Sequence, residues 1–163
     1  MRRESPEGER AFTMQTARKL GEIFLRREPE SVSRSRAMVR ELLGPDHPAY
    51  ERVRLAVSEL TTNAVEHSTP GPVGDLVMVV LKVVDDFVYV EVTDPGSASG
   101  KPCLKIPSPD AEDGRGLFIV DELSAGNWGV RDFGAVGRTV WCAIPAEPTA
   151  SVEEAAVLGV RPE

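Results

Sequence analysis

The sequence predicts an α+β domain in which helices cover one face of a largely antiparallel sheet. Two segments with apolar residues at helical spacing come first, and Val-rich segments with alternating residues follow them. The predicted order is strand, helix, helix, hairpin, helix, hairpin, which favours a layer of helices on a sheet. The chain has 163 residues, which is the length of one ordinary domain.

The first half of the domain is expected to contain a strand and two helices. Residues 22–27 are expected to form a short edge strand. Ser31 is the expected N-cap of the first helix, and Gly44 is its C-terminal stop signal. A second helix is predicted from Pro48 to Ser68, because apolar residues recur with the spacing of one helical face. These residues are Val53, Val57, Leu60 and Ala64.

The first hairpin is predicted from alternation and from its turn. The pair Asp85-Asp86 separates residues 76–84 from residues 87–93, as a two-residue hairpin turn does. Alternate valines of the second strand face one way and indicate a core on that side of the sheet. These are Val88, Val90 and Val92.

A long segment, residues 94–116, separates the two hairpins and is rich in Gly, Pro, Ser and Asp. A loop of this length in a small domain is usually functional or disordered. Residues 117–124 return to a helical pattern, and residues 128–133 and 138–144 are expected to form a closing pair of strands. The expected organisation is a mobile N-terminal arm (1–20), a folded domain (21–145) and an acidic C-terminal tail (146–163).

Composition excludes several classes of function. Acidic residues outnumber basic residues by 26 to 19, which gives a net charge of -7 and a pI near 5.0. Nucleic acids and anionic membranes are therefore not expected as partners, because both are bound through a basic excess. Two cysteines and two histidines predict neither a disulfide scaffold nor a zinc site. No signal sequence or membrane-spanning apolar run is apparent, so a cytoplasmic protein is expected.

The first candidate site lies on the second predicted helix, in the segment SELTTNAVEH. Glu59 and Asn63 are one helical turn apart and share a face with Glu66 or His67. A carboxylate can accept a proton, and an amide oxygen suits Mg²⁺, which binds few protein ligands beside substrate phosphates. A solvated helix face with an incidental Asn is the alternative, and it is the commoner one for such a segment alone.

The second candidate is Asp94-Pro95-Gly96, at the end of the Val-rich strand. The carboxylate of Asp94 can accept a hydrogen bond from a ligand amine, while Gly96 allows the backbone to pass close by. The alternative is a plain turn, since Asp, Pro and Gly are all turn residues.

The third candidate is the segment DGRGL, just before the third predicted helix. Gly114 and Gly116 would let backbone N–H groups at the helix start face an anion such as phosphate. Arg115 can add a charge-assisted contact. A glycine-rich helix entry without a ligand is the alternative. Thr139, at the start of the last strand, can hydrogen-bond a ligand but needs no special explanation in a strand.

Taken in order, four segments resemble the GHKL ATP-binding superfamily, which includes gyrase, Hsp90, histidine kinases and MutL. The segments are ELTTNAVEH, VEVTDPG, GRGLFIVDEL and GRTVW. The chain is most similar to the small bacterial anti-sigma-factor serine/threonine kinases, and the resemblance covers residues 22–144. It implies a two-layer α/β sandwich, the Bergerat-type ATP-binding fold, with helices on one face of a mixed, mostly antiparallel sheet.

The resemblance also implies roles for the matching residues. Glu59 matches a catalytic glutamate that activates the acceptor hydroxyl, and Asn63 matches an asparagine that binds Mg²⁺ between the ATP phosphates. Asp94 matches the aspartate that binds the adenine amino group, with Gly96 beside the base. The other residues expected to bind ATP are Gly114, Arg115, Gly116, Leu117, Thr139 and His67. Residues 97–113 are expected to form a lid over the nucleotide.

The resemblance implies a cytoplasmic protein kinase that uses ATP and Mg²⁺. It would sequester a sigma factor and phosphorylate a serine or threonine of an anti-sigma-factor antagonist, and a homodimer is a further expectation. Autophosphorylation on histidine is not expected, because no helix with a phospho-acceptor histidine precedes the domain. Two alternatives stay open: a module that senses ATP with little or no transfer, and an interaction domain without nucleotide.

Overall fold

The computed structural model describes residues 17–67, 76–94, 115–133 and 137–147. The strands are β1 (Arg18–Arg26), β2 (Leu76–Val84), β3 (Phe87–Asp94), β4 (Trp128–Asp132) and β5 (Arg138–Pro145). The helices are α1 (Glu30–Leu42), α2 (Tyr50–His67) and α3 (Arg115–Ser124).

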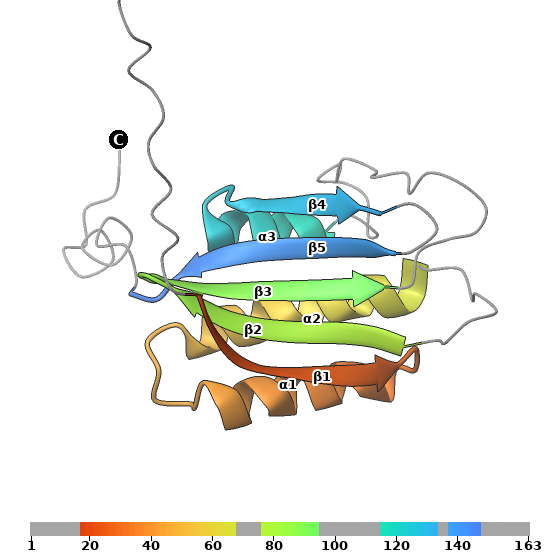
Figure 1. Ribbon diagram of the computed structural model, residues 1–163, viewed down its shortest axis with the longest axis horizontal. Coiled ribbons are helices and arrows are strands. Elements are labelled where there is room, and N and C mark those ends of the chain that lie inside the picture. The colour runs from red at the N-terminus through yellow and green to blue at the C-terminus, as the bar shows by residue number, and fades with distance from the viewer. Residues whose placement is uncertain (1–16, 68–75, 95–114, 134–136, 148–163) are drawn as a thin grey trace, which may run out of the picture.

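The strands form one sheet in the order β1-β2-β3-β5-β4, with the described helices on one of its faces (Figure 1). Every strand pairing among the described residues is antiparallel. The two-layer α+β fold and the order of its elements are therefore confirmed. The sheet is more regular than the mixed one that the resemblance implies.

The core lies between the sheet and the inner faces of the helices. All four apolar residues predicted for the second helix are buried, and so are the alternate valines of β3. They pack with the inward side chains of β2 and β5, which include Val77, Val79, Leu81 and Ile144. The spacing of apolar residues thus predicted which faces of α2 and β3 are buried.

α1 differs from the prediction at its start. The helix begins one residue before Ser31, and its N-cap position is Pro29, which makes no side-chain cap. Ser31 is fully buried, and its hydroxyl donates to the carbonyl oxygen of Arg26 at the end of β1. The predicted capping role of Ser31 was therefore wrong, because a tertiary acceptor was within reach. Gly44 ends the helix as predicted, with a φ of 86° that favours glycine.

β1 is longer than predicted and begins at Arg18 instead of Glu22. It pairs with β2 along its length, with one irregularity between Lys19 and Gly21. Residues 18–20 are thus part of the sheet and not of an arm. Residues 1–16 of the expected arm, the whole of the expected lid (97–113) and the tail beyond residue 147 lie outside the described residues.

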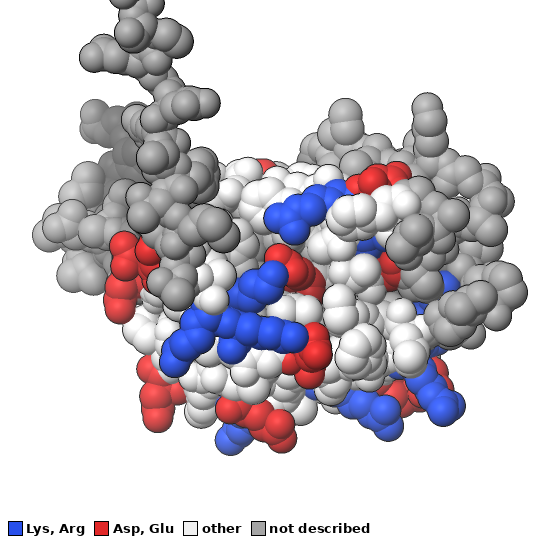
Figure 2. Space-filling model, in the orientation of Figure 1, with Lys and Arg blue, Asp and Glu red and all other residues white. Residues whose placement is uncertain are grey.

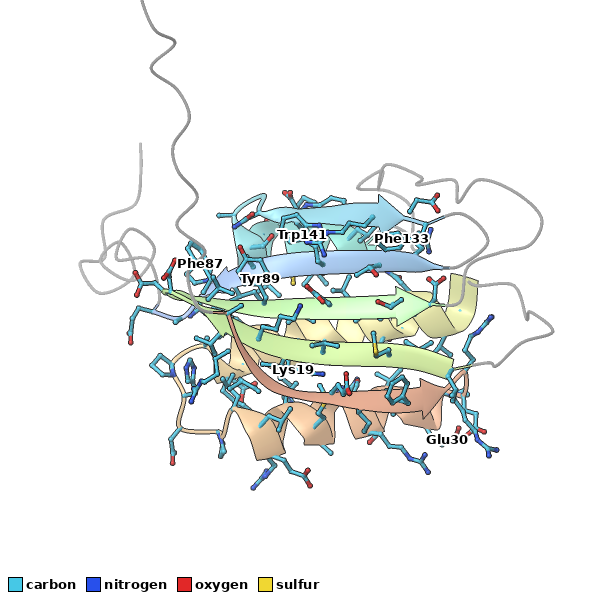
Figure 3. All side chains as sticks on the ribbon, viewed as in Figure 1. Lys19, Glu30, Phe87, Tyr89, Phe133 and Trp141 are labelled. Atoms are coloured by element: carbon cyan, nitrogen blue, oxygen red, sulfur yellow. The ribbon has the colours of Figure 1, made fainter. Side chains whose placement is uncertain are left out.

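The second face of the sheet carries no described helix, as Figure 1 shows. Acidic and basic side chains alternate across its middle (Figure 2). The rings of Tyr89 and Trp141, labelled in Figure 3, stack with their centroids 6.1 Å apart. We call this side of the sheet the open face. No described helix is long and apolar enough to cross a membrane.

Candidate nucleotide site

The candidate site is assembled at the end of the domain where α2 and β3 end and β5 begins (Figure 1). α2 reaches this end because its apolar stripe packs along the sheet for the whole length of the helix. The antiparallel register between β3 and β5 places the last residue of β3, Asp94, opposite the first residue of β5, Arg138. Side chains from distant parts of the sequence are thus available at one end of the molecule.

Glu59 and Asn63 project from α2 toward the first turn of α3. Both side chains are partly buried. A Cβ atom at Gly116 would lie 2.7 Å from Glu59 Oε2 and 3.5 Å from Asn63 Oδ1. A side chain at position 116 would therefore displace the Glu59 carboxylate and come into ordinary contact with the Asn63 amide. The structure thus brings Glu59, Asn63 and Gly116 together.

The start of α3 can receive an anion. The first backbone N–H groups of a helix have no partner within the helix, and the helix dipole makes this end positive. No acidic residue occupies the first turn of α3. Arg115 is exposed at its first position, and Leu117 is partly buried against the core. This donor set fits phosphate oxygens.

Asn63 fits a magnesium ion only when other ligands complete the shell. Among the described residues, no three side chains of His, Cys, Asp or Glu form a cluster that could hold a metal by themselves. Mg²⁺ accepts one amide oxygen together with water and substrate phosphates. The chemistry of Asn63, beside an anion-receiving helix start, suits this kind of ion.

Asp94, at the end of β3, is the acidic group at the sheet side of the site. Its side chain is only 5% exposed and lies on the helix side of the sheet, in line with Val90 and Val92. Its Oδ2 lies 3.5 Å from an Nη2 of Arg138. A buried carboxylate with a nearby guanidinium is an acceptor of fixed position, as a ligand amine requires.

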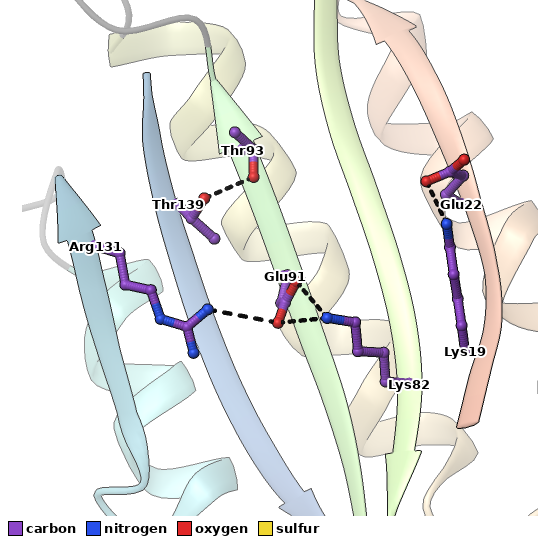
Figure 4. A network of polar contacts seen from close by, with 7 residues as sticks. All are labelled: Lys19, Glu22, Lys82, Glu91, Thr93, Arg131 and Thr139. Carbon is purple, nitrogen blue, oxygen red and sulfur yellow. Dashed lines mark hydrogen bonds and ion pairs between the residues drawn. The ribbon is translucent and has the colours of Figure 1, made fainter. Parts of the chain in front are cut away.

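Thr139 lies on the opposite side of the sheet from Asp94. Its hydroxyl is 2.7 Å from the hydroxyl of Thr93, its partner in the register (Figure 4). Neighbouring residues of a strand face opposite sides, so the Thr93–Thr139 pair belongs to the open face. The structure does not bring Thr139 together with Asp94, and the residue at that place on β5 is Arg138.

Arg138 is the site residue that sequence reasoning missed. The sequence shows that Arg138 directly precedes Thr139. It does not show which of the two lies opposite Asp94 in the sheet, and this depends on the register of β3 and β5. Two other expected residues, Gly96 and Gly114, lie outside the described residues. His67 is the last residue of α2, and its backbone is at the same end of the helix as Asn63.

Residues 25–141 match the family model of the histidine kinase-like ATPase domain. Because the match spans most of the sequence, the chain belongs to this family. A search of the curated proteins gives no match. The family and the resemblance found in the sequence agree.

A solved structure shows the same fold. The crystal structure of the RsbU and RsbW domains of Rv1364c from Mycobacterium tuberculosis matches with a TM-score of 0.55 and 23% identity. The match covers 77% of this chain and 32% of that one. The histidine kinase domain of the blue-light activated histidine kinase from Erythrobacter litoralis EL346 matches with a TM-score of 0.49 and 22% identity. This match covers 71% of this chain and 63% of that one.

Proposed function

We propose that the chain is an ATP- and Mg²⁺-dependent serine/threonine protein kinase of the anti-sigma-factor type. It sequesters a sigma factor in the cytoplasm and phosphorylates a small antagonist protein. Membership of the histidine kinase-like ATPase family supports the binding of ATP. The observation that carries the proposal is the contact of Glu59 and Asn63 with Gly116 at the start of α3.

In this proposal the phosphate groups of ATP lie at the start of α3, where backbone N–H groups and Arg115 bind them. Asn63 would hold Mg²⁺, and the ion would supply charge neutralisation on the phosphates. Asp94 accepts a hydrogen bond from the adenine amino group. These residues mainly position the reactants and stabilise charge, which is most of what phosphoryl transfer asks of a protein.

Glu59 acts as the general base. The acceptor hydroxyl of the antagonist gives its proton to the Glu59 carboxylate while its oxygen forms a bond to the γ-phosphorus. The bond from that phosphorus to the β-phosphate oxygen breaks, and ADP leaves. The partly buried position of Glu59 beside a helix start is compatible with this role, since a base must reach the proton that it removes.

Calorimetric titration with ATP and Mg²⁺ tests the binding part. We expect the parent protein to bind, and Asn63→Ala and Asp94→Asn to weaken binding by about tenfold or more. Glu51→Gln is a matched control, because Glu51 lies in the first turn of α2 and is 77% exposed. No binding by the parent protein would favour an interaction domain without nucleotide.

Phosphate transfer to an antagonist tests the kinase part. Glu59→Gln keeps the shape of the side chain but cannot accept the proton, so we expect transfer to fall by about 10²-fold or more while ATP still binds. Transfer by this variant at the parental rate would overturn the role of Glu59. Binding of ATP without transfer by the parent protein to any antagonist would favour the nucleotide-sensing module.

A further inference from the structure

Arg138 and Asp94 form a cross-strand pair on the helix side of the sheet. They are opposite each other in the register of β3 and β5, and Nη2 lies 3.5 Å from Oδ2. The Arg138 side chain is 16% exposed and the Asp94 side chain 5%. An ion pair of this kind holds both side chains in place, since neither has much solvent to turn into.

The contact leaves hydrogen-bonding capacity on Arg138. At 3.5 Å it is longer than the ~2.8 Å of a strong charge-assisted hydrogen bond. The Nε atom of Arg138 is buried and has no hydrogen-bond partner among the described residues. A buried N–H without an acceptor is costly, and such a group in a native structure calls for an explanation. A ligand atom that accepts a hydrogen bond from Nε would explain why this group has no partner within the described part of the protein.

We propose that Arg138 is a specificity-determining residue for the nucleotide base. It holds the Asp94 carboxylate toward the purine and donates its Nε–H to a purine ring nitrogen. The pair then offers one acceptor and one donor side by side. This inference rests on the proposed function, because it needs the base of ATP to lie beside Asp94.

Adenine presents the complementary pattern. Its 6-amino group is a donor, and the ring nitrogens on either side, N1 and N7, are acceptors. A carboxylate alone can accept from the amine but cannot read a ring nitrogen, since it has no hydrogen to donate. With Arg138 beside it, the pocket can recognise two neighbouring atoms of the base.

Arg131 offers a matched comparison. It lies on β4, opposite Thr139 in the register, and its guanidinium is on the open face. There it contacts Glu91 at 3.7 Å and lies 5.7 Å from the centre of the Trp141 ring. The two arginines on these paired strands thus lie on opposite sides of the sheet. Of the two, Arg138 is the one that faces Asp94.

The test compares the affinities of four nucleotides by calorimetry. They are ATP, purine riboside triphosphate, 1-deaza-ATP and 7-deaza-ATP. The parent protein is expected to bind ATP about threefold to tenfold more tightly than the analogue without the amine and than one of the two deaza analogues. We call the affinity for ATP relative to purine riboside triphosphate the amine ratio, and the affinity for ATP relative to that deaza analogue the ring-nitrogen ratio. In Arg138→Met the ring-nitrogen ratio is expected to fall to about one, because the donor is lost. The amine ratio is expected to become smaller, because Asp94 is no longer held in place.

A variant that binds all four nucleotides more weakly by the same factor keeps the ratios of the parent protein, so the ratios report only on recognition of the base. Circular dichroism shows whether each variant is folded. Arg138→Lys keeps the positive charge beside Asp94 and serves if the Met variant does not fold. It is expected to keep the amine ratio and to lose most of the ring-nitrogen ratio, since lysine lacks the rigid planar donors. Arg131→Met is expected to keep both ratios of the parent protein.

Two outcomes would overturn the inference in different ways. If the parent protein binds ATP and Arg138→Met keeps both ratios, the role of Arg138 fails and the proposed function stands. A parent protein that binds none of the four nucleotides overturns the proposed function and the role of Arg138 with it.

Discussion

Gly116 of α3 lies directly against the Glu59 carboxylate of α2. A Cβ atom at position 116 would be 2.7 Å from Oε2, closer than real Cβ atoms approach such a group. The absence of a side chain at this place lets the start of α3 approach the polar face of α2. The same glycine is the second residue of α3, and glycine is a poorer helix former than alanine. Its presence there is therefore better explained by the site than by the stability of the helix.

Gly116→Ala should separate stability from activity. Alanine is favoured over glycine by about 1 kcal/mol in a helix interior and by less in the first turn, and this gain opposes the strain against a flexible carboxylate. We therefore expect the thermal unfolding midpoint to stay close to that of the parent protein. Displacement of Glu59 should lower phosphate transfer by about tenfold or more, since catalysis depends on its position. Thermal unfolding and a transfer assay measure these two properties.

A parental rate of transfer by Gly116→Ala would show that the Glu59 carboxylate can move without cost. Adding Glu59→Gln to the alanine variant provides a control. If both changes act through one group, the double variant should transfer no more slowly than Glu59→Gln alone.

Thr139→Val tests whether the hydroxyl of Thr139 serves the nucleotide or the open face. Valine keeps the branched shape that suits a strand but leaves the Thr93 hydroxyl without its 2.7 Å partner. We expect the free energy of unfolding to fall by about 1 kcal/mol and the affinity for ATP to remain unchanged. Denaturant unfolding and calorimetric titration measure these two quantities.

The double variant Thr93→Val/Thr139→Val is the control for Thr139→Val. Replacing both partners of a hydrogen bond by apolar groups costs less than removing one, so its stability should be closer to that of the parent protein. A clear loss of ATP affinity in Thr139→Val would instead place this hydroxyl at the nucleotide, as the sequence alone suggested.

The fold was predictable because its signals are local. The apolar stripe of α2, the alternation of β3 and the Asp85-Asp86 turn are each read within one short segment, and all three are confirmed. The Ser31 cap failed for the opposite reason. Its hydroxyl bonds to Arg26, an acceptor outside the helix that no propensity includes.

The site was predictable only in part. Glu59 and Asn63 share a helix face, which their spacing shows, but their contact with Gly116 depends on how α2 and α3 pack. The place of Arg138 depends on the register between β3 and β5, because a shift of one residue exchanges the two faces of a strand. Spacing within a segment carries no information on either relationship.

Glu91 should be worth more to stability than either cation that it binds. Its carboxylate is 15% exposed and receives Lys82 at 3.1 Å and Arg131 at 3.7 Å (Figure 4). Glu91→Gln leaves two cations near one another without an anion, so we expect a loss of about 1–2 kcal/mol. Lys82→Met leaves Glu91 with Arg131 and should cost about 1 kcal/mol or less. Urea unfolding at low and high salt measures both.

The difference between the two variants should shrink at high salt, because screening weakens the repulsion between Lys82 and Arg131. Equal losses in Glu91→Gln and Lys82→Met at both salt concentrations would mean that the cations act independently. The network in the middle of the open face would then be a set of separate surface pairs.

Cys142 should give the protein a stability that declines at high pH. Burial raises the pKa of its thiol from the ordinary 9.0 to about 12, and a backbone hydrogen bond from Val90 opposes part of this shift. Between these two values the unfolded chain loses a proton that the folded chain keeps. The native state therefore binds more protons, and the free energy of unfolding falls as the pH rises through this window. The contribution of the thiol is fully present below pH 9.

Replacing Cys142 by alanine should make this decline shallower, although the loss of a buried sulfur lowers stability at every pH. Urea unfolding between pH 8 and pH 11, about the range that the two pKa values indicate, provides the comparison. Both proteins should carry Cys103→Ser, so that only one thiol differs between them. Lysine and tyrosine side chains also titrate in this range, and they contribute equally to both slopes. Identical slopes would mean that the Cys142 thiol ionises in the folded protein as easily as in the unfolded chain.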